Sequence, residues 1–299
     1  MLWSILCLLN NSGKNDCIFY SMISIIICSK NKDISEQLKS NIEATIGVRY
    51  EIVVIDNSKQ GYSIFSAYNE GIRRASYNYL CFMHEDIRYH SNDWGTKISI
   101  HLDKPETGLI GLSGAYYLLA IPSPWFKAKP YVKNQIQSDP TGRKASKRYS
   151  ITEDKEVICV DGFWFCARKN IFEQVSFDEK TFDNFHFYDL DISMQIHEKG
   201  FRIYAVSDIV VEHLSGGSFN SDWLKSAYAF YRKWEKYLPA TVNPSLKKKK
   251  FVNIKAFRYL LCIHKKNHYP LSAETWKIGW KQLRLNLLIA YFLYIIKLL

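Results

Sequence analysis

The sequence predicts an α/β fold built around a mainly parallel sheet. Over residues 22–86, buried β-branched runs alternate with amphipathic stretches of helical period. Such alternation produces right-handed strand–helix–strand units, whose helices cover the faces of a sheet. A polar cluster follows each of the three predicted strands, and ligands bind beyond the carboxyl ends of strands in such sheets. The sequence therefore predicts a binding site along one edge of the sheet.

Three strands and two helices account for the first part of the chain. The first strand is a continuous apolar run at residues 22–28, as expected for a strand buried on both faces. The next two lie at residues 50–55 and 79–83. The first helix is expected to follow Asp33, an N-cap residue with a glutamate three positions later. The second occupies residues 64–75, where apolar side chains recur on one face.

The middle of the chain combines regular elements with one long irregular stretch. A helix is expected at residues 94–102 and a strand at residues 108–115. Residues 121–155 are rich in Pro, Lys, Ser and Gly, and a connection of that length inside a compact domain is usually functional or mobile. Strand character resumes at residues 156–168, and a further helix is expected at residues 189–200, ending at a glycine.

Three parts follow from this pattern. Residues 1–21 are expected to be an N-terminal extension, residues 22–219 an α/β domain and residues 220–299 a basic helical region. The apolar runs at residues 1–9 and 287–296 are too short to cross a bilayer. We therefore expect a cytoplasmic protein, or one held peripherally on the inner face of the cell membrane.

The composition is that of a globular chain with unevenly placed charge. Of 299 residues, 47% are apolar and 23% are charged, which excludes a disordered protein. The net charge is +11, and residues 220–299 hold 16 Lys and Arg against three acids, so the rest of the chain is close to neutral. A basic tail on a near-neutral body indicates an anionic surface as the partner of the tail alone. No nucleic-acid recognition motif is present, so nucleic acid is not the expected partner.

The seven cysteines show neither a CxxC pair nor metal-ligand spacing. Several of them lie inside apolar strand-like runs. We interpret them as small buried apolar residues in a reducing cytosol.

Several polar residues at the strand ends could carry chemistry, but each also has a structural explanation when it is taken alone. The triplet at residues 84–86 is either a metal site or a solvated turn. Asp56 suits a turn, His213 suits a structural role, and Asp189 is favoured at a helix N-terminus in any case. Their order and spacing carry more information than any one of them.

That order and spacing resemble the family 2 glycosyltransferases with the GT-A fold. The resemblance covers about two-thirds of the chain, and its parts are specific only in combination. Within the family, the chain is most similar to a subgroup with streptomycin-biosynthesis-type proteins and capsule glucosyltransferases. The matching segments are SIIICSKN at 24–31, VVIDNS at 53–58, AYNEGIRRA at 67–75, YLCFMHEDI at 79–87, VDGFWFCARK at 160–169, FYDLDISMQIHEKGFRIY at 187–204 and VEHLSGGS at 211–218.

The resemblance implies a nucleotide pocket at the carboxyl ends of the first strands. Ser29 and Asn31 would line this pocket, and Asp56 would accept a hydrogen bond from the base, normally uracil or thymine. Asn69 and His84 complete the expected nucleotide-binding set.

The same resemblance implies a metal ion and a general base. Asp86 and His213 would bind a divalent cation, Mn²⁺ or Mg²⁺, with His84 as a further ligand. Asp189 would be the catalytic base, and Asp191 would help it by orienting the same helix end.

An acceptor site and two departures from the family pattern complete this prediction. Asp161 and Gly162 would border the acceptor cleft. His84 stands where the family triplet usually opens with Asp, and Tyr188 stands where an acid commonly precedes the base. Imidazole in place of a carboxylate removes one negative charge and favours softer ions than Mg²⁺.

The implied reaction is an inverting glycosyl transfer in cell-envelope or capsule polysaccharide synthesis. The donor would be a UDP- or dTDP-sugar, and the acceptor a saccharide or lipid-linked saccharide. One alternative is a non-catalytic nucleotide-sugar-binding subunit. Another is a sugar-1-phosphate nucleotidyltransferase, which should carry a glycine-rich basic loop after the first strand, where residues 29–32 read Ser-Lys-Asn-Lys.

The basic tail suits a membrane surface. Basic residues and aromatic residues alternate along residues 247–291. Each Lys or Arg near an anionic leaflet contributes about 1 kcal/mol, and an apolar helix face at the interface adds to this. We therefore expect the tail to hold the site beside a lipid-linked acceptor.

Overall fold

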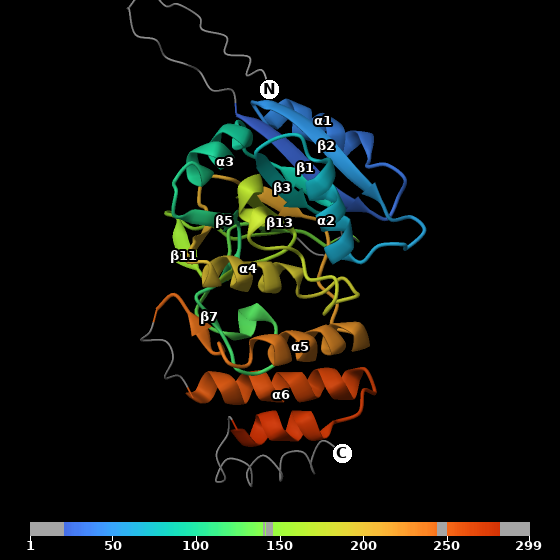
Figure 1. Ribbon diagram of the computed structural model, residues 1–299, viewed down its shortest axis with the longest axis vertical. Coiled ribbons are helices and arrows are strands. Elements are labelled where there is room, and N and C mark those ends of the chain that lie inside the picture. The colour runs from blue at the N-terminus through green and yellow to red at the C-terminus, as the bar shows by residue number, and fades with distance from the viewer. Residues whose placement is uncertain (1–20, 140, 142–145, 244–249, 282–299) are drawn as a thin grey trace, which may run out of the picture.

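The computed structural model describes residues 21–139, 141, 146–243 and 250–281 (Figure 1). Three predicted segments lie wholly or mostly outside these ranges: all but the last residue of the expected extension at residues 1–21, the apolar run at residues 287–296 and most of the lysine run at residues 247–250. Within them, no helix is long and apolar enough to cross a membrane.

A seven-stranded sheet forms the centre of the upper part of the molecule in Figure 1. Its strands lie in the order β11-β14-β5-β13-β3-β1-β2, and only β13 and β11 run against the other five. The predicted mainly parallel α/β sheet is thus confirmed. The strands are β1 (Met22–Ser29), β2 (Arg49–Asp56), β3 (Tyr79–Met83), β5 (Thr107–Gly111), β11 (Lys155–Val157), β13 (Trp164–Arg168) and β14 (Arg202–Ala205).

Helices cover both faces of this sheet. Alternate residues of β1 face opposite sides, so Ile25 packs into one apolar core and Ile26 into the other. One core lies under α1 and α3, and the other lies under α2 and α4. The helices are α1 (Glu36–Thr45), α2 (Ile64–Arg74), α3 (Trp94–Leu102) and α4 (Tyr188–Glu198).

The first helix begins slightly later than the sequence suggested. The N-cap is Ser35, whose Oγ accepts a hydrogen bond from the backbone N–H of Leu38 at 3.3 Å. Asp33 instead binds Lys39 with its carboxylate at 2.6 Å. Both residue types cap helices well, but the expectation of Asp33 was wrong, because its carboxylate binds the Lys39 side chain and the backbone N–H of Ile34 instead.

Short strands form smaller sheets that are separate from the large sheet. The expected irregular stretch contains the 3₁₀ helix η1 (Trp125–Lys127) and several of these strands. Another 3₁₀ helix, η2 (Lys169–Glu173), follows β13. The short strands are β4 (Ile87–Tyr89), β6 (Gly114–Ala115), β7 (Tyr117–Leu118), β8 (Tyr131–Val132), β9 (Ile136–Gln137), β10 (Lys147–Arg148), β12 (Cys159–Val160), β15 (Val211–His213) and β16 (Ala240–Thr241).

The C-terminal region is helical, as expected, and shares a core with the α/β domain. Figure 1 shows α5 (Ser221–Trp234) and α6 (Lys250–Lys266) stacked below α4. The same apolar cluster that lies under α2 and α4 includes Trp223 on α5 and Phe257 on α6. The basic region therefore begins as part of the folded body.

Candidate active site

A cleft of about 720 Å³ opens where the carboxyl ends of β1 and β3 meet the N-terminus of α4. It collects side chains from segments far apart in the chain, as the predicted edge site requires. The predicted site residues that line it are His84, Asp86, Asp161, Gly162, Asp189 and His213.

Strand pairing brings the possible metal ligands together. The backbone N–H of His84 is held by the carbonyl of Phe163 at 3.0 Å, directly after β3. The antiparallel pair of β4 and β15 sets His213 opposite Ile87, and the N–H of Leu214 binds the carbonyl of Asp86 at 2.9 Å. The site therefore depends on the pairing of strands that are more than 120 residues apart in sequence.

His84, Asp86 and His213 form a compact cluster of possible metal ligands. Their ligand atoms all lie within 4.8 Å of one another. Oδ1 of Asp86 lies 3.7 Å from Nδ1 of His84 and 3.6 Å from Nε2 of His213. Burial, helped by the nearby His213, lowers the pKa of His84 to about 4. A neutral imidazole is the form that binds metals.

Asp189 lies in the first turn of α4 and faces the same cleft. Its carboxylate accepts the backbone N–H of Gly162 at 2.9 Å and that of Leu190 at 2.9 Å. These donors favour the charged form, but burial and the neighbouring carboxylate of Asp161 act more strongly in the opposite direction. Together they raise the pKa of Asp189 to about 7. A carboxyl group with this pKa can take up a proton near neutral pH.

Asp161 and Gly162 lie beside this carboxylate. Burial raises the pKa of Asp161 as well. A side chain at position 162 would collide with the phenol of Tyr188, so glycine is needed for the backbone to approach α4. This close approach lets the Gly162 N–H reach Asp189.

Of the expected nucleotide-binding residues near the first strands, Ser29, Asn31 and Asp56 do not line the cleft, although Cys28 and Lys30 do. Ser29 and Asp56 are neighbours across the parallel pair β1 and β2. The buried Ser29 hydroxyl donates a hydrogen bond to Glu85, whereas Asn31 and Asp56 are exposed to solvent. Glu85 itself lines the cleft, together with its sequence neighbours His84 and Asp86.

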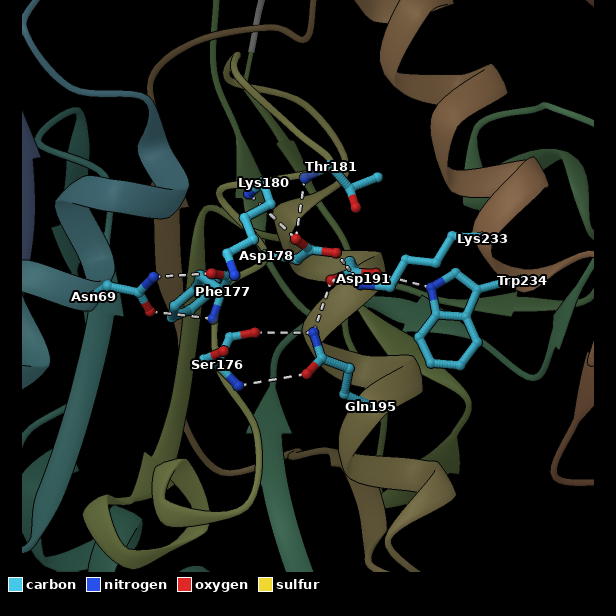
Figure 2. A network of polar contacts seen from close by, with 10 residues as sticks. All are labelled: Asn69, Ser176, Phe177, Asp178, Lys180, Thr181, Asp191, Gln195, Lys233 and Trp234. Atoms are coloured by element: carbon cyan, nitrogen blue, oxygen red, sulfur yellow. Dashed lines mark hydrogen bonds and ion pairs between the residues drawn. The ribbon is translucent and has the colours of Figure 1, made fainter.

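Asn69 does not face the cleft. Its side-chain amide is used at both ends by the backbone of Phe177, donating to the carbonyl at 2.8 Å and accepting the N–H at 3.1 Å (Figure 2). This pair of bonds fixes the segment before α4 to α2. Asn69 therefore supports the segment around Phe177, and its place in the sequence did not reveal this role.

Asp191 also lies away from the cleft, on the opposite side of α4 from Asp189. Its fully buried carboxylate accepts hydrogen bonds from Trp234 Nε1 at 2.8 Å, Gln195 Nε2 at 2.8 Å and Lys233 Nζ at 2.9 Å (Figure 2). Burial raises the pKa of Asp191, and Lys233 opposes this effect. The structure thus places Asp191 as an anchor between α4 and α5, outside the cleft lining.

Lys233 connects a second carboxylate to this anchor. Its ammonium lies 2.7 Å from Asp178, which precedes α4 (Figure 2). Burial alone would raise the pKa of Asp178, but hydrogen bonds from Lys233 and Thr181 lower it to about 2. One lysine of α5 therefore joins two segments that flank the base.

Sequence reasoning missed several residues that line the cleft. The long stretch at residues 121–155 contributes Lys133, Gln135 and Gln137, and α5 contributes Trp223. The unusual length of that stretch predicted a functional segment, but no motif in it indicated which of its side chains line the site. They face the cleft because β9 pairs with β15, beside His213.

Comparison with known proteins identifies the family. A family model described as "Glycosyltransferase like family" matches residues 24–269. The chain belongs to this glycosyltransferase-like family. The match extends through α5 and α6, in agreement with the core that they share with the α/β domain. No curated protein sequence matches the chain.

The solved structure of a glycosyltransferase shares the architecture, and a second one matches at a lower TM-score. The mannosyltransferase PcManGT from Pyrobaculum calidifontis, in complex with GDP-Man and Mn²⁺, is 12% identical with a TM-score of 0.50, over 86% of this chain and 77% of its own. GalNAc-T7 with UDP, GalNAc and Mn²⁺ is 15% identical with a TM-score of 0.48, over 85% of this chain. The present chain spans 59% of the length of that GalNAc-T7 structure. The mixed α/β sheet and the similarity to the mannosyltransferase structure confirm the expected GT-A fold.

Proposed function

We propose that the protein is an inverting glycosyltransferase that uses a nucleoside-diphosphate sugar, UDP- or dTDP-linked, as donor. The observation that carries this proposal is the shared cleft, in which Asp189 and the cluster of His84, Asp86 and His213 line one space. Sugar transfer needs a base for the acceptor hydroxyl and positive charge for the departing diphosphate. This cleft offers groups suited to both tasks.

Asp189 is the proposed base. Its pKa of about 7 allows it to accept a proton from the acceptor hydroxyl near neutral pH. The backbone N–H groups of Gly162 and Leu190 fix the carboxylate in place before substrate binds. Asp161 and Gly162, beside it, border the proposed acceptor site.

The cluster of His84, Asp86 and His213 fits a divalent cation. Two imidazoles and one carboxylate form a donor set that suits Mn²⁺ and similar ions better than Mg²⁺, which prefers oxygen ligands. When bound, such an ion would supply positive charge to the diphosphate of the donor. Asn31 and Asp56, at the exposed end of β1 and β2, are proposed to contact the nucleotide.

The proposed acceptor is a saccharide or lipid-linked saccharide in cell-envelope polysaccharide synthesis, including capsule. An anionic membrane surface is the proposed partner of the C-terminal region. Residues 273–281 are helical and expose 37% of Trp276 and 61% of Trp280, and Lys277 and Lys281 are exposed beside them. Aromatic and basic side chains on one helix suit the interface of an anionic bilayer.

Co-sedimentation with vesicles tests the membrane proposal. A double variant, Trp280→Ser with Lys277→Glu, should bind phosphatidylserine-containing vesicles more weakly than the wild type, because it removes an exposed apolar anchor and reverses one charge. Both side chains are exposed, so the fold should be retained. Equal sedimentation of both proteins would contradict this part of the proposal.

Calorimetry and a transfer assay test the reaction itself. We expect one of a panel of nucleotide sugars to bind the protein more tightly with Mn²⁺ than without it. The Asp189→Asn variant should bind the same donor and fail to transfer the sugar. If the wild type binds the donor but transfers nothing to any saccharide or lipid-linked acceptor, the protein is a nucleotide-sugar-binding subunit and the enzyme proposal is wrong.

A further inference from the structure

The two positions that depart from the family pattern touch each other. Nε2 of His84 lies 2.8 Å from the hydroxyl of Tyr188, although the residues are 104 positions apart. We infer that Tyr188 is a positioning residue that holds His84 as a metal ligand through Nδ1, and that the pair favours Mn²⁺ over Mg²⁺ in the cleft. This inference rests on the proposed function, because it concerns the metal of the same site.

The hydrogen bonds of Tyr188 determine which nitrogen of His84 carries the proton. The phenol has one proton, and its oxygen lies 2.9 Å from the backbone carbonyl of Gly162, which can only accept. Tyr188 therefore donates to Gly162 and accepts from His84. His84 must carry its proton on Nε2, and the lone pair is left on Nδ1.

That lone pair faces another acceptor. Nδ1 of His84 lies 3.7 Å from Oδ1 of Asp86, which is too long for a hydrogen bond. Nε2 of His213 lies 3.6 Å from the same oxygen. Two atoms that each bind one ion at about 2.1 Å lie at most about 4.2 Å apart, so both spacings suit a shared ion. A cation among these atoms would relieve the repulsion between the lone pair of His84 Nδ1 and the carboxylate of Asp86.

The phenol ring cannot easily leave this position. Tyr188 is buried, and its ring packs edge-on against Phe65 at 6.3 Å and Tyr68 at 5.6 Å. A carboxylate at position 188 would instead face the carbonyl of Gly162, with no proton to share. Tyr188 and His84 therefore suit each other: the Tyr188 oxygen accepts the N–H of His84, and the Tyr188 proton goes to the carbonyl of Gly162.

A second histidine cluster shows what is particular about His84. His101 places Nε2 2.9 Å from Asp208 and Nδ1 3.4 Å from Asp154, so both of its nitrogens already face carboxylates. His84 has a neutral hydroxyl on one nitrogen and a single carboxylate near the other. The neutral partner leaves the site with two imidazoles and one negative charge, which favours softer cations over Mg²⁺.

Metal titration of the Tyr188→Phe variant tests the positioning role. Removing the hydroxyl frees the orientation of His84, and we expect Mn²⁺ affinity, measured by calorimetry without donor, to fall about 10- to 100-fold. The control is Tyr68→Phe, whose buried hydroxyl has no hydrogen-bond partner within the described structure and whose ring packs against Tyr188. That control should bind Mn²⁺ like the wild type. Wild-type affinity in Tyr188→Phe would overturn the inference.

A spectroscopic count of ligands remains decisive if Tyr188→Phe fails to fold. Electron spin echo spectra of bound Mn²⁺ should show two imidazole nitrogens in the wild type and one in His84→Asp. The His84→Asp variant should also lose about tenfold or more of the preference for Mn²⁺ over Mg²⁺. A wild-type spectrum with a single imidazole nitrogen would overturn the inference.

These measurements separate the inference from the proposed reaction. Metal binding is followed without donor or acceptor, so a negative result there leaves sugar transfer open. Conversely, if the protein binds Mn²⁺ as expected but transfers no sugar, the proposed reaction is wrong and the inferred role of Tyr188 in positioning His84 still holds.

Discussion

Asp189 and Asp191 lie two residues apart on α4, yet they occupy opposite environments. Asp189 faces the cleft, where burial and Asp161 raise its pKa to about 7. Asp191 is fully buried on the other side, where Lys233 and Trp234 bind its carboxylate. Two residues advance an α-helix by about 200°, so neighbours at this spacing point in nearly opposite directions.

The difference shows how one helix can serve both chemistry and structure. A carboxylate that is buried without a cation is difficult to ionise, so it becomes a proton acceptor near neutral pH. A carboxylate that is buried beside a lysine forms an ion pair, and this pair holds together the two elements on which the residues lie. Here Asp191 fixes α4 to α5, and this attachment holds Asp189 at the cleft.

The largest effect is expected from Asp189→Asn in the transfer assay. An amide cannot accept the proton of the acceptor hydroxyl, so turnover should fall by about 10²- to 10⁴-fold. Donor binding should be retained, because the substitution preserves size. Asp191→Asn should lose less turnover, measured under conditions where it remains folded. Equal losses in the two variants would remove the functional distinction between these aspartates.

The next largest effect is expected in chemical unfolding of Lys233→Met. This change leaves Asp191, whose side chain is 0% exposed, without its cation, and it should lower the free energy of unfolding by about 3–5 kcal/mol. The matched control is Lys225→Met on the same helix, whose pair with Asp222 is exposed and should contribute little to the free energy of unfolding. A loss as small as that of the control would show that Asp191 is not an anchor.

A smaller effect of opposite sign is expected for the stability of Asp189→Asn. Because the folded pKa of Asp189 lies above its unfolded value of about 4, the folded protein holds the proton more tightly between about pH 4 and pH 7. Its ionisation therefore lowers stability as pH rises through that range. Without metal at pH 8, Asp189→Asn should be more stable than the wild type by on the order of 1–3 kcal/mol. At pH 4 the two should be nearly equal, and a destabilised variant at pH 8 would contradict the raised pKa.

Much of the fold could be predicted because it follows local pattern. The apolar run of β1 and the polar residues after β3 are visible in the sequence, and parallel pairing then sets them at one edge. The cap at Ser35 was missed, because Asp33 and Ser35 are both good capping residues and tertiary contacts decide between them. The helical nature of the C-terminal region was expected, but its shared core with α4 depends on long-range packing.

The sequence predicted several residues of the candidate site, but it was less informative about what each residue contacts. Asp86, Asp189 and His213 meet at the cleft, as their spacing suggested. Asn69 and Asp191 were predicted in the same site but bind structural partners outside the cleft. A sequence motif does not show which side of a helix each of its residues faces. The contact between His84 and Tyr188 was equally hidden, since it forms only when β3 and α4 pack together.

The most direct test of the central claim is the pH dependence of sugar transfer by the wild type with Mn²⁺ and saturating donor. If Asp189 is the base, the rate should rise with pH through a single step at the pKa of Asp189, which is about 7 in the metal-free protein and lower beside a bound cation, and Asp189→Asn should show no such step. A wild-type rate that is flat from pH 5 to pH 9, or the same step in Asp189→Asn, would contradict it.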